Sequence, residues 1–200
     1  MAEPSDPLLQ EIDEDLRHER MARLWQRYGN AVIGVALAVV VIVAGHQGWK
    51  SYDLSKRQDA SLRYTEAARI ADQKNAVEAE KAFAVLAQNA PAGYAMLARF
   101  REAALAAQQG DAPRAASLYR RLAGDGGIET SFRDLALMLA ALTDADRAEP
   151  KALRQEIGRL MADASPWRHM ARELAALLSL KTGETPGARE EFRRLAEDPT

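Results

Sequence analysis

The sequence contains no cysteine and only three histidines among its 200 residues. Without cysteine, the chain cannot form disulfides, zinc sites built on thiolates or a cysteine nucleophile. The histidines, His18, His46 and His169, lie far apart, and no histidine pair has the spacing of a metal site. Glycine-rich phosphate-binding loops and the serine elbow of hydrolases are also missing. The sequence therefore predicts no metal site, no cofactor and no catalytic residues.

Neither sign of charge dominates, since 27 Lys and Arg residues stand against 29 Asp and Glu residues. Four of the basic and seven of the acidic residues precede residue 28, so the rest of the chain is also close to balance. A nucleic-acid-binding surface needs a concentrated positive field. We therefore expect no nucleic-acid partner, and the mixed charges are typical of solvated helix faces.

One stretch, residues 28–49, carries no charge and centres on AVIGVALAVVVIVAG. As a helix rising about 1.5 Å per residue it reaches roughly 33 Å, enough to cross about 30 Å of bilayer hydrocarbon. Trp25 and Trp49 flank it, at positions where a bilayer interface favours aromatic rings. A buried core helix would show a polar stripe, and this run has none. The pattern predicts a transmembrane helix over 28–49, in contact with the lipid bilayer.

A cleaved signal peptide is the main alternative for this run, because Val43 and Gly45 are small enough to precede a cleavage site. However, the preceding 27 residues contain seven acidic residues. Signal peptides instead begin with a short basic region. An uncleaved anchor is therefore the preferred interpretation.

Basic residues flank both ends of the run in nearly equal number. Counting Lys and Arg alone therefore barely favours either orientation of the helix in the membrane. Four of them lie on the short N-terminal tail: Arg17, Arg20, Arg23 and Arg27. Those after the run begin a large domain, where they weigh less. We expect the tail, 1–27, in the cytoplasm and the domain, 50–200, outside. Asp6 and Pro7 predict the start of a helix in the tail, either solvated or docked on a partner.

The region after the run has the pattern of helices separated by turns. Nothing breaks a helix between Lys50 and Asp72, so the anchor is expected to continue into the domain as one long helix. Further helices are expected at 76–89, 92–109, 113–123, 129–143, 150–163, 166–181 and 186–196. Turn signals such as Gly110-Asp111 and Gly183 separate them. No segment alternates as a strand does, and the fold class predicted is all-α.

The domain contains an internal repeat. Residues 94–125, YAMLARFREAALAAQQGDAPRAASLYRRLAGD, align without gaps to residues 167–198, WRHMARELAALLSLKTGETPGAREEFRRLAED. The shift of 73 residues equals two units of about 36, near the tetratricopeptide period of about 34. The sequence thus predicts a tetratricopeptide-like solenoid over 50–200, able to fold without the anchor. Phe192 is expected to be buried against Trp167, so that its replacement by alanine costs about 3–5 kcal/mol.

A partner-binding face is expected on the first helix of each pair, which lines the groove in such stacks. The residues predicted to bind a partner are Phe100, Ala104, Gln108, Leu177 and Lys181. Phe100 and Leu177 have an alternative role as ordinary core, because apolar residues at helical spacing usually pack inward. Gln108 and Lys181 distinguish a partner-binding face from a core better than the apolar residues do, since a hydrophobic core would exclude their long polar side chains.

The sequence resembles the YfgM family of ancillary Sec translocon subunits in bacteria. The resemblance covers about 20–198 and is carried mainly by WRHMARELAALLSLKTGETPGAREEF and YAMLARFREAALAAQQGD. It implies a single-pass inner-membrane protein with a periplasmic domain. It also implies partners among Sec translocon subunits, periplasmic chaperones such as PpiD, and exported proteins. The family has no catalytic residues to transfer, and the long acidic tail is a departure from its pattern.

Two other functions are alternatives to this interpretation. A scaffold for envelope assembly or cell division could use the same anchor and repeats with different partners. An enzyme would require a convergent set of polar residues that the sequence does not show. The first expectation is therefore a non-enzymatic interaction protein anchored in the membrane.

Overall fold

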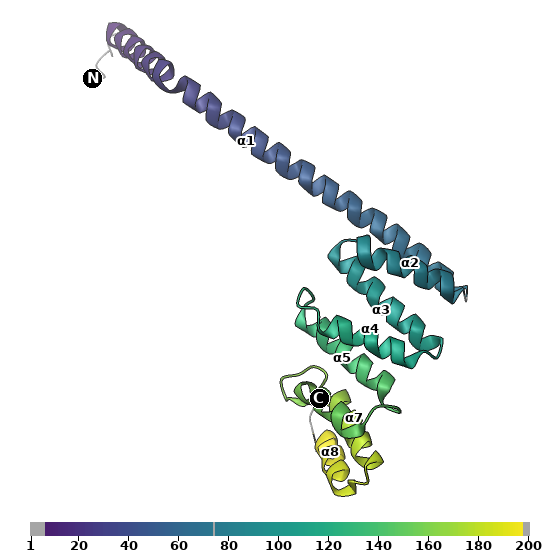
Figure 1. The fold of residues 1–200 in the computed structure, drawn as a ribbon. Helices are drawn as coiled ribbons and strands as arrows, with labels where there is room; N and C mark the ends of the chain where they lie inside the picture. Colours follow the sequence, from purple (N-terminus) through teal and green to yellow (C-terminus); the bar gives the residue numbers. More distant parts are fainter. Residues whose placement is uncertain (1–6, 74, 198–200) are drawn as a thin grey trace. The chain divides into compact units, whose positions relative to one another are not determined.

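The structure is a computed structural model that describes residues 7–73 and 75–197. Within these ranges every regular element is a helix (Figure 1). The chain divides into two units, Met1–Ser55 and Lys56–Thr200, and each is described by itself. The prediction of an all-α fold is confirmed.

The first helix, α1, runs without interruption over Pro7–Asp72. It begins at the predicted first helical residue, Pro7, while the proposed cap, Asp6, lies outside the described residues. The side chains of its uncharged run remain exposed, for example 66% at Val35 and 69% at Ile42. Among the described helices, α1 is the one long and apolar enough to cross a membrane. A long apolar helix that buries almost none of its surface has the properties of a segment solvated by lipid.

Seven α-helices and one 3₁₀ helix follow α1 in the described part of the second unit. They are α2 (Ala76–Asn89), α3 (Ala92–Gln108), α4 (Ala112–Ala123), α5 (Thr130–Asp144), α6 (Pro150–Glu156), η1 (Gly158–Met161), α7 (Arg168–Lys181) and α8 (Thr185–Glu197). Their bounds lie within two residues of the predicted ones, with one exception. The helix expected over 150–163 stops at Glu156 and continues as η1, where Gly158 weakens the α-helical conformation.

The turns within the two repeat copies have the same hydrogen bonds. After α3, the Gly110 amide donates to the Ala107 carbonyl over 3.0 Å and the Asp111 amide to the Ala106 carbonyl over 2.9 Å. The bonds after α7 join the equivalent atoms 73 residues later. Gly110 and Gly183 have φ of 82° and 78°, a left-handed conformation in which glycine carries no steric cost. This is the Schellman ending of a helix, and it reverses the chain into the second helix of each pair.

Three hydrophobic clusters form the core of the second unit, and each joins neighbouring helices. Phe83 lies in the cluster of α1, α2 and α3. Tyr119 lies in the cluster of α3, α4 and α5, and Leu178 in that of α5, α6, η1 and α7. Many of the buried residues are alanines, which let neighbouring helices approach closely. A core distributed between successive helices is the arrangement expected of a repeat solenoid.

The expected burial of Phe192 is wrong. Its side chain is 38% exposed, whereas Tyr119, at the same position of the first repeat copy, is 6% exposed. Tyr119 lies in a cluster shared with α5, which follows α4. The described residues cover the Phe192 ring only in part, whereas α5 completes the cover of Tyr119.

Candidate protein-binding surfaces

The α3 half of the predicted face is mostly part of the core. Phe100 is half-buried and its ring lies 6.2 Å from that of Tyr119, centroid to centroid, at 49°. Ala104 is half-buried as well, and Gln108 is exposed. Of the three residues predicted on α3, therefore, Gln108 is the exposed one that a partner can contact. Phe100 packs in the core, which was the alternative role considered for it from the sequence.

The α7 half of the predicted face is more open. Leu177 and Leu180 are each 47% exposed, and Met170, two turns before Leu177, is 42% exposed. These apolar side chains recur at helical spacing on one face of α7. This helix thus presents an apolar stripe that the described residues leave uncovered.

Lys181 is the last residue of α7, and its side chain contacts the residues that follow α5. Its Nζ donates to the Ala145 carbonyl oxygen over 2.8 Å and lies 2.7 Å from Asp146 Oδ1. The hydrogen bond from Lys181 lowers the pKa of Asp146, which keeps this carboxylate charged. Leu142, 43% exposed, lies one turn before Ala145 on α5. We call Leu142, Leu177 and Leu180 the α5–α7 face; Leu142 was missed because its exposure depends on how the two helices meet.

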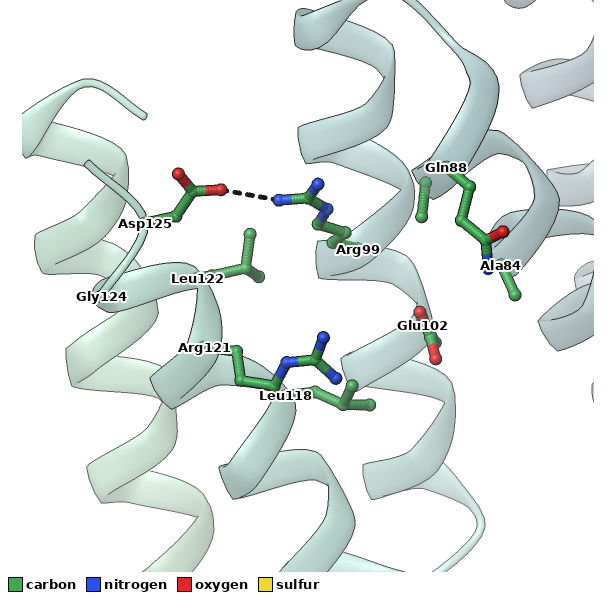
Figure 2. Close-up of a pocket in the computed structure, with 10 residues that line it drawn as sticks. Ala84, Gln88, Arg99, Glu102, Leu118, Arg121, Leu122, Gly124 and Asp125 are labelled. Carbon is green, nitrogen blue, oxygen red and sulfur yellow. Dashed lines mark hydrogen bonds and ion pairs between the residues drawn. The ribbon is translucent and has the colours of Figure 1, made fainter. Parts of the chain in front are cut away.

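A second candidate surface is a groove of about 660 Å³ between α2, α3 and α4. Ala84, Ala87 and Gln88 come from α2, Arg99 and Glu102 from α3, and Leu118, Arg121, Leu122, Gly124 and Asp125 from α4 and the turn after it (Figure 2). Arg99 and Glu102 project roughly 150° around α3 from Phe100 and Ala104. The groove is therefore on the opposite side of α3 from the face predicted from the sequence.

The acidic residues of this groove have partners within the chain. Arg99 Nη1 lies 2.8 Å from Asp125 Oδ2, an ion pair visible in Figure 2. The Gly127 amide and Arg99 hydrogen-bond to the Asp125 carboxylate and lower its pKa. Glu102 lies 3.8 Å from Arg114. Arg121, in contrast, is exposed and makes no ion pair with another described residue.

Comparison with protein families identifies the architecture. A family model described as a tetratricopeptide repeat-like domain matches residues 23–198. The chain belongs to this family. Neither the curated proteins nor the solved structures include a match to the chain. Tetratricopeptide-like repeats are typically non-enzymatic modules that bind other proteins, so protein–protein interaction is the general role of this domain.

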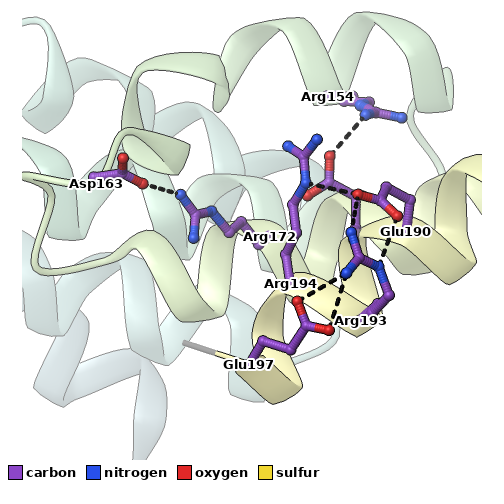
Figure 3. Close-up of polar contacts among 8 residues, drawn as sticks. Arg154, Asp163, Arg172, Glu190, Arg193, Arg194 and Glu197 are labelled. Carbon is purple, nitrogen blue, oxygen red and sulfur yellow. Dashed lines mark hydrogen bonds and ion pairs between the residues drawn. The ribbon is translucent and has the colours of Figure 1, made fainter. Parts of the chain in front are cut away.

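The charged side chains around the last repeat hold tetratricopeptide helices together. Arg154 of α6 donates to Ser179 Oγ of α7 over 2.6 Å and to Glu191 Oε1 of α8 over 3.3 Å. Arg172 pairs with Asp163 (Figure 3), and its Nε donates to the Met161 carbonyl oxygen over 3.2 Å. Within the described residues, no three His, Asp or Glu side chains converge as metal ligands. These polar groups act as links between helices.

Proposed function

We propose that this protein is a non-enzymatic interaction protein anchored in the bacterial inner membrane, an ancillary component of the Sec translocon. Its domain links the translocon to periplasmic chaperones such as PpiD or to newly exported proteins. The observation that carries the proposal is one match to a tetratricopeptide-like family that includes both the apolar helix and the repeats, over 23–198. The resemblance to YfgM proteins supplies the specific partners.

The proposed topology has three parts: a cytoplasmic tail at 1–27, a transmembrane helix at 28–49 and a periplasmic domain at 50–200. It rests on the exposed apolar run of α1 and on the arginines of the tail. A reporter that works only outside the cytoplasm, fused after Thr200, is expected to be active. Activity from a reporter that works only in the cytoplasm would reverse the orientation. A mature protein beginning at His46 would favour the signal-peptide alternative.

The partner-binding face in this proposal is formed by the exposed residues of α3 and α7. Leu177 supplies apolar contact, while Gln108 and Lys181 supply polar contacts at its edge. Phe100 and Ala104 support the face from the core. Lys181 has a second role, because it also holds the Ala145 carbonyl. Its charge reversal would therefore disturb the end of α5, and Leu177 is the better residue to test.

Site-specific photocross-linking in native membranes tests this function. A photoreactive residue at position 177 is expected to form adducts with Sec translocon subunits or a periplasmic chaperone. The control position is Val77 on α2, which is 61% exposed and lies away from the α5–α7 face. Adducts only with envelope-assembly or division proteins would favour the scaffold alternative. Adducts only with cytoplasmic proteins would refute both proposals.

A further inference from the structure

The exposed apolar stripe of α7 has one acidic side chain at its centre, Glu173. At about 100° per residue, Leu180, Leu177 and Met170 all project within roughly 60° of Glu173 around the helix. Glu173 is exposed, and the three apolar side chains are 47%, 47% and 42% exposed. Met170 lies one turn before Glu173 and Leu177 one turn after it, so both are its neighbours on the helix surface. The stripe thus presents a carboxylate within an open hydrocarbon surface.

The lysine at the C-terminal end of α7 does not neutralise this carboxylate. Lys181 Nζ lies 2.7 Å from Asp146 Oδ1 and donates to the Ala145 carbonyl oxygen, which holds it at the end of α5. It is also eight residues from Glu173, or about 12 Å along the helix axis. Glu173 makes no ion pair with another described residue.

The other basic side chains of α7 point elsewhere or are less open. Arg172 projects about 100° away from Glu173 around the helix, and it pairs with Asp163. Arg168 projects about 140° away. His169, one turn before Glu173, is half-buried. The charge that the stripe leaves unbalanced is therefore negative, and a basic side chain is its complement.

The first repeat copy has no such centre. At the positions aligned with Glu173, Leu177 and Leu180 it carries one aromatic ring and two alanines: Phe100, Ala104 and Ala107. The aromatic ring packs in the core. The second copy thus exposes larger apolar side chains and places an acid between them. Contiguous exposed apolar side chains next to polar groups are typical of interaction surfaces.

We infer that the α7 stripe binds a partner segment in which one basic residue is flanked by apolar residues. The basic side chain lies on Glu173, and its apolar neighbours lie on Met170 and Leu177. The inference rests on the proposed function, since it names the chemistry of the segment that this face recognises. The stripe rises about 15 Å from Met170 to Leu180, and five extended residues span about 13 Å with alternate side chains on one face. An apolar–x–basic–x–apolar pattern therefore fits it.

Peptide binding to the full chain in nanodiscs tests the inference. The probe is a capped, fluorescently labelled peptide of sequence Leu-Ser-Lys-Ser-Leu, and its reference has glutamine in place of lysine. We expect the lysine peptide to bind about fivefold more tightly at low salt, the upper value for an ion pair at a surface. The preference should shrink at high salt because the charges are then screened. Fluorescence anisotropy measures the affinities.

Four variants assign the preference to this stripe. Glu173→Gln is expected to remove it, and Glu173→Lys to reverse it in favour of a peptide with glutamate at the central position. The control is Glu78→Gln on α2, an exposed acid that accepts a hydrogen bond from Asn75, and it should leave the preference intact. Leu177→Ser is expected to weaken the binding of both peptides alike.

Several outcomes would overturn the inference. Equal affinity for the lysine and glutamine peptides would do so, as would a preference that survives Glu173→Gln or disappears in Glu78→Gln. Adducts from position 177 that join two copies of this chain would assign the stripe to a second copy instead. If cross-links from position 177 reach the translocon but the lysine preference is absent, this inference alone fails. If the preference is present without such cross-links, recognition of a basic segment stands and the proposed partners are wrong.

Discussion

The two copies of the aligned repeat, α3–α4 and α7–α8, have the same local structure but bury different parts of it. Their turns share the same hydrogen bonds, and Ala115 and Ala188 are both fully buried at the same position of the second helix. The outer face of that helix differs, since Tyr119 is 6% exposed and Phe192 is 38% exposed. Local structure follows the repeat pattern, whereas burial depends on which neighbouring helices pack against each copy.

The aligned arginines at the next position show the same difference in polar contacts. Arg120 reaches neighbouring helices, with Nη1 2.6 Å from Asp144 Oδ2 on α5 and Nε 2.8 Å from Glu156 Oε1 on α6. Arg193 pairs with Glu190 and Glu197 of its own helix, over 2.8 and 2.9 Å (Figure 3). In the first copy the arginine joins repeats, and in the second it neutralises an exposed face.

The largest expected effect is that of removing the aromatic ring in each copy. Tyr119→Ala in the 50–200 fragment is expected to cost about 3–4 kcal/mol, because it empties a site within a buried cluster. Phe192→Ala is expected to cost less than half of that, since its ring is partly solvated. Denaturant unfolding measures both. Equal losses would mean that the outer face of α8 is covered in solution.

Removal of the aligned arginines should give the next largest difference. Arg120→Met is expected to cost about 2 kcal/mol, because Asp144, 8% exposed, loses a partner between helices. Arg193→Met is expected to leave the unfolding midpoint unchanged, since its partners are exposed on the same helix. Thermal melts of both variants make the comparison. A larger loss for Arg193→Met would show that α8 depends on its own charge pairs.

The two turn glycines should respond alike at the local level. Alanine at Gly110 or Gly183 meets no atom within 4 Å of its Cβ, so the cost comes from the positive φ alone. We expect about 1 kcal/mol for each substitution. Gly110→Ala should lower global stability, while Gly183→Ala should mainly increase the opening of α8. Hydrogen exchange resolved by helix separates these outcomes, and uniform protection loss after Gly183→Ala would contradict the second.

Acid should weaken the contacts between repeats by a smaller amount. Burial raises the pKa of Asp144, but hydrogen bonds from Arg120 and Arg147 outweigh it, and the net pKa is lowered. Its contribution to stability is therefore full above the ordinary pKa of 3.8 and is lost as the pH falls below that value. Asp144→Asn should lower stability at neutral pH and flatten the acid limb of the stability curve. If the loss of stability at low pH were the same in Asp144→Asn as in the unsubstituted protein, titration of Asp144 would not be its cause.

The pKa of Glu190 is also lowered, to about 2, by hydrogen bonds from Arg193 and Arg194. Its contribution is lost between the ordinary value of 4.5 and about 2 as the pH falls. Because all three residues belong to α8, this loss should appear as local opening of that helix. A matched Glu190→Gln variant is expected to change hydrogen exchange in α8 and leave the global midpoint in place.

The helix pattern and turn glycines were sufficient to predict the local structure except at 157–163, where the expected α-helix ends at Glu156 and η1 follows. Gly110 and Gly183 marked the turns correctly, and the absence of helix breakers between Lys50 and Asp72 predicted that the anchor continues to Asp72. The exposure of Phe192 could not be predicted in this way, because burial depends on which helices pack against a residue and not on its place in the repeat. The groove was also missed, since Arg99 and Asp125 are 26 residues apart in sequence and meet only when α3 and α4 pack together.

The self-neutralised charges of α8 have a consequence for polymerisation. A row of repeats that ends in an apolar face can add another molecule end to end, and each addition exposes the same face again. On α8, a new neighbour would have to strip water from Glu190, Arg193 and Glu197 without offering them better partners. The charged side of α8 that carries these three residues therefore disfavours association with another molecule through that side.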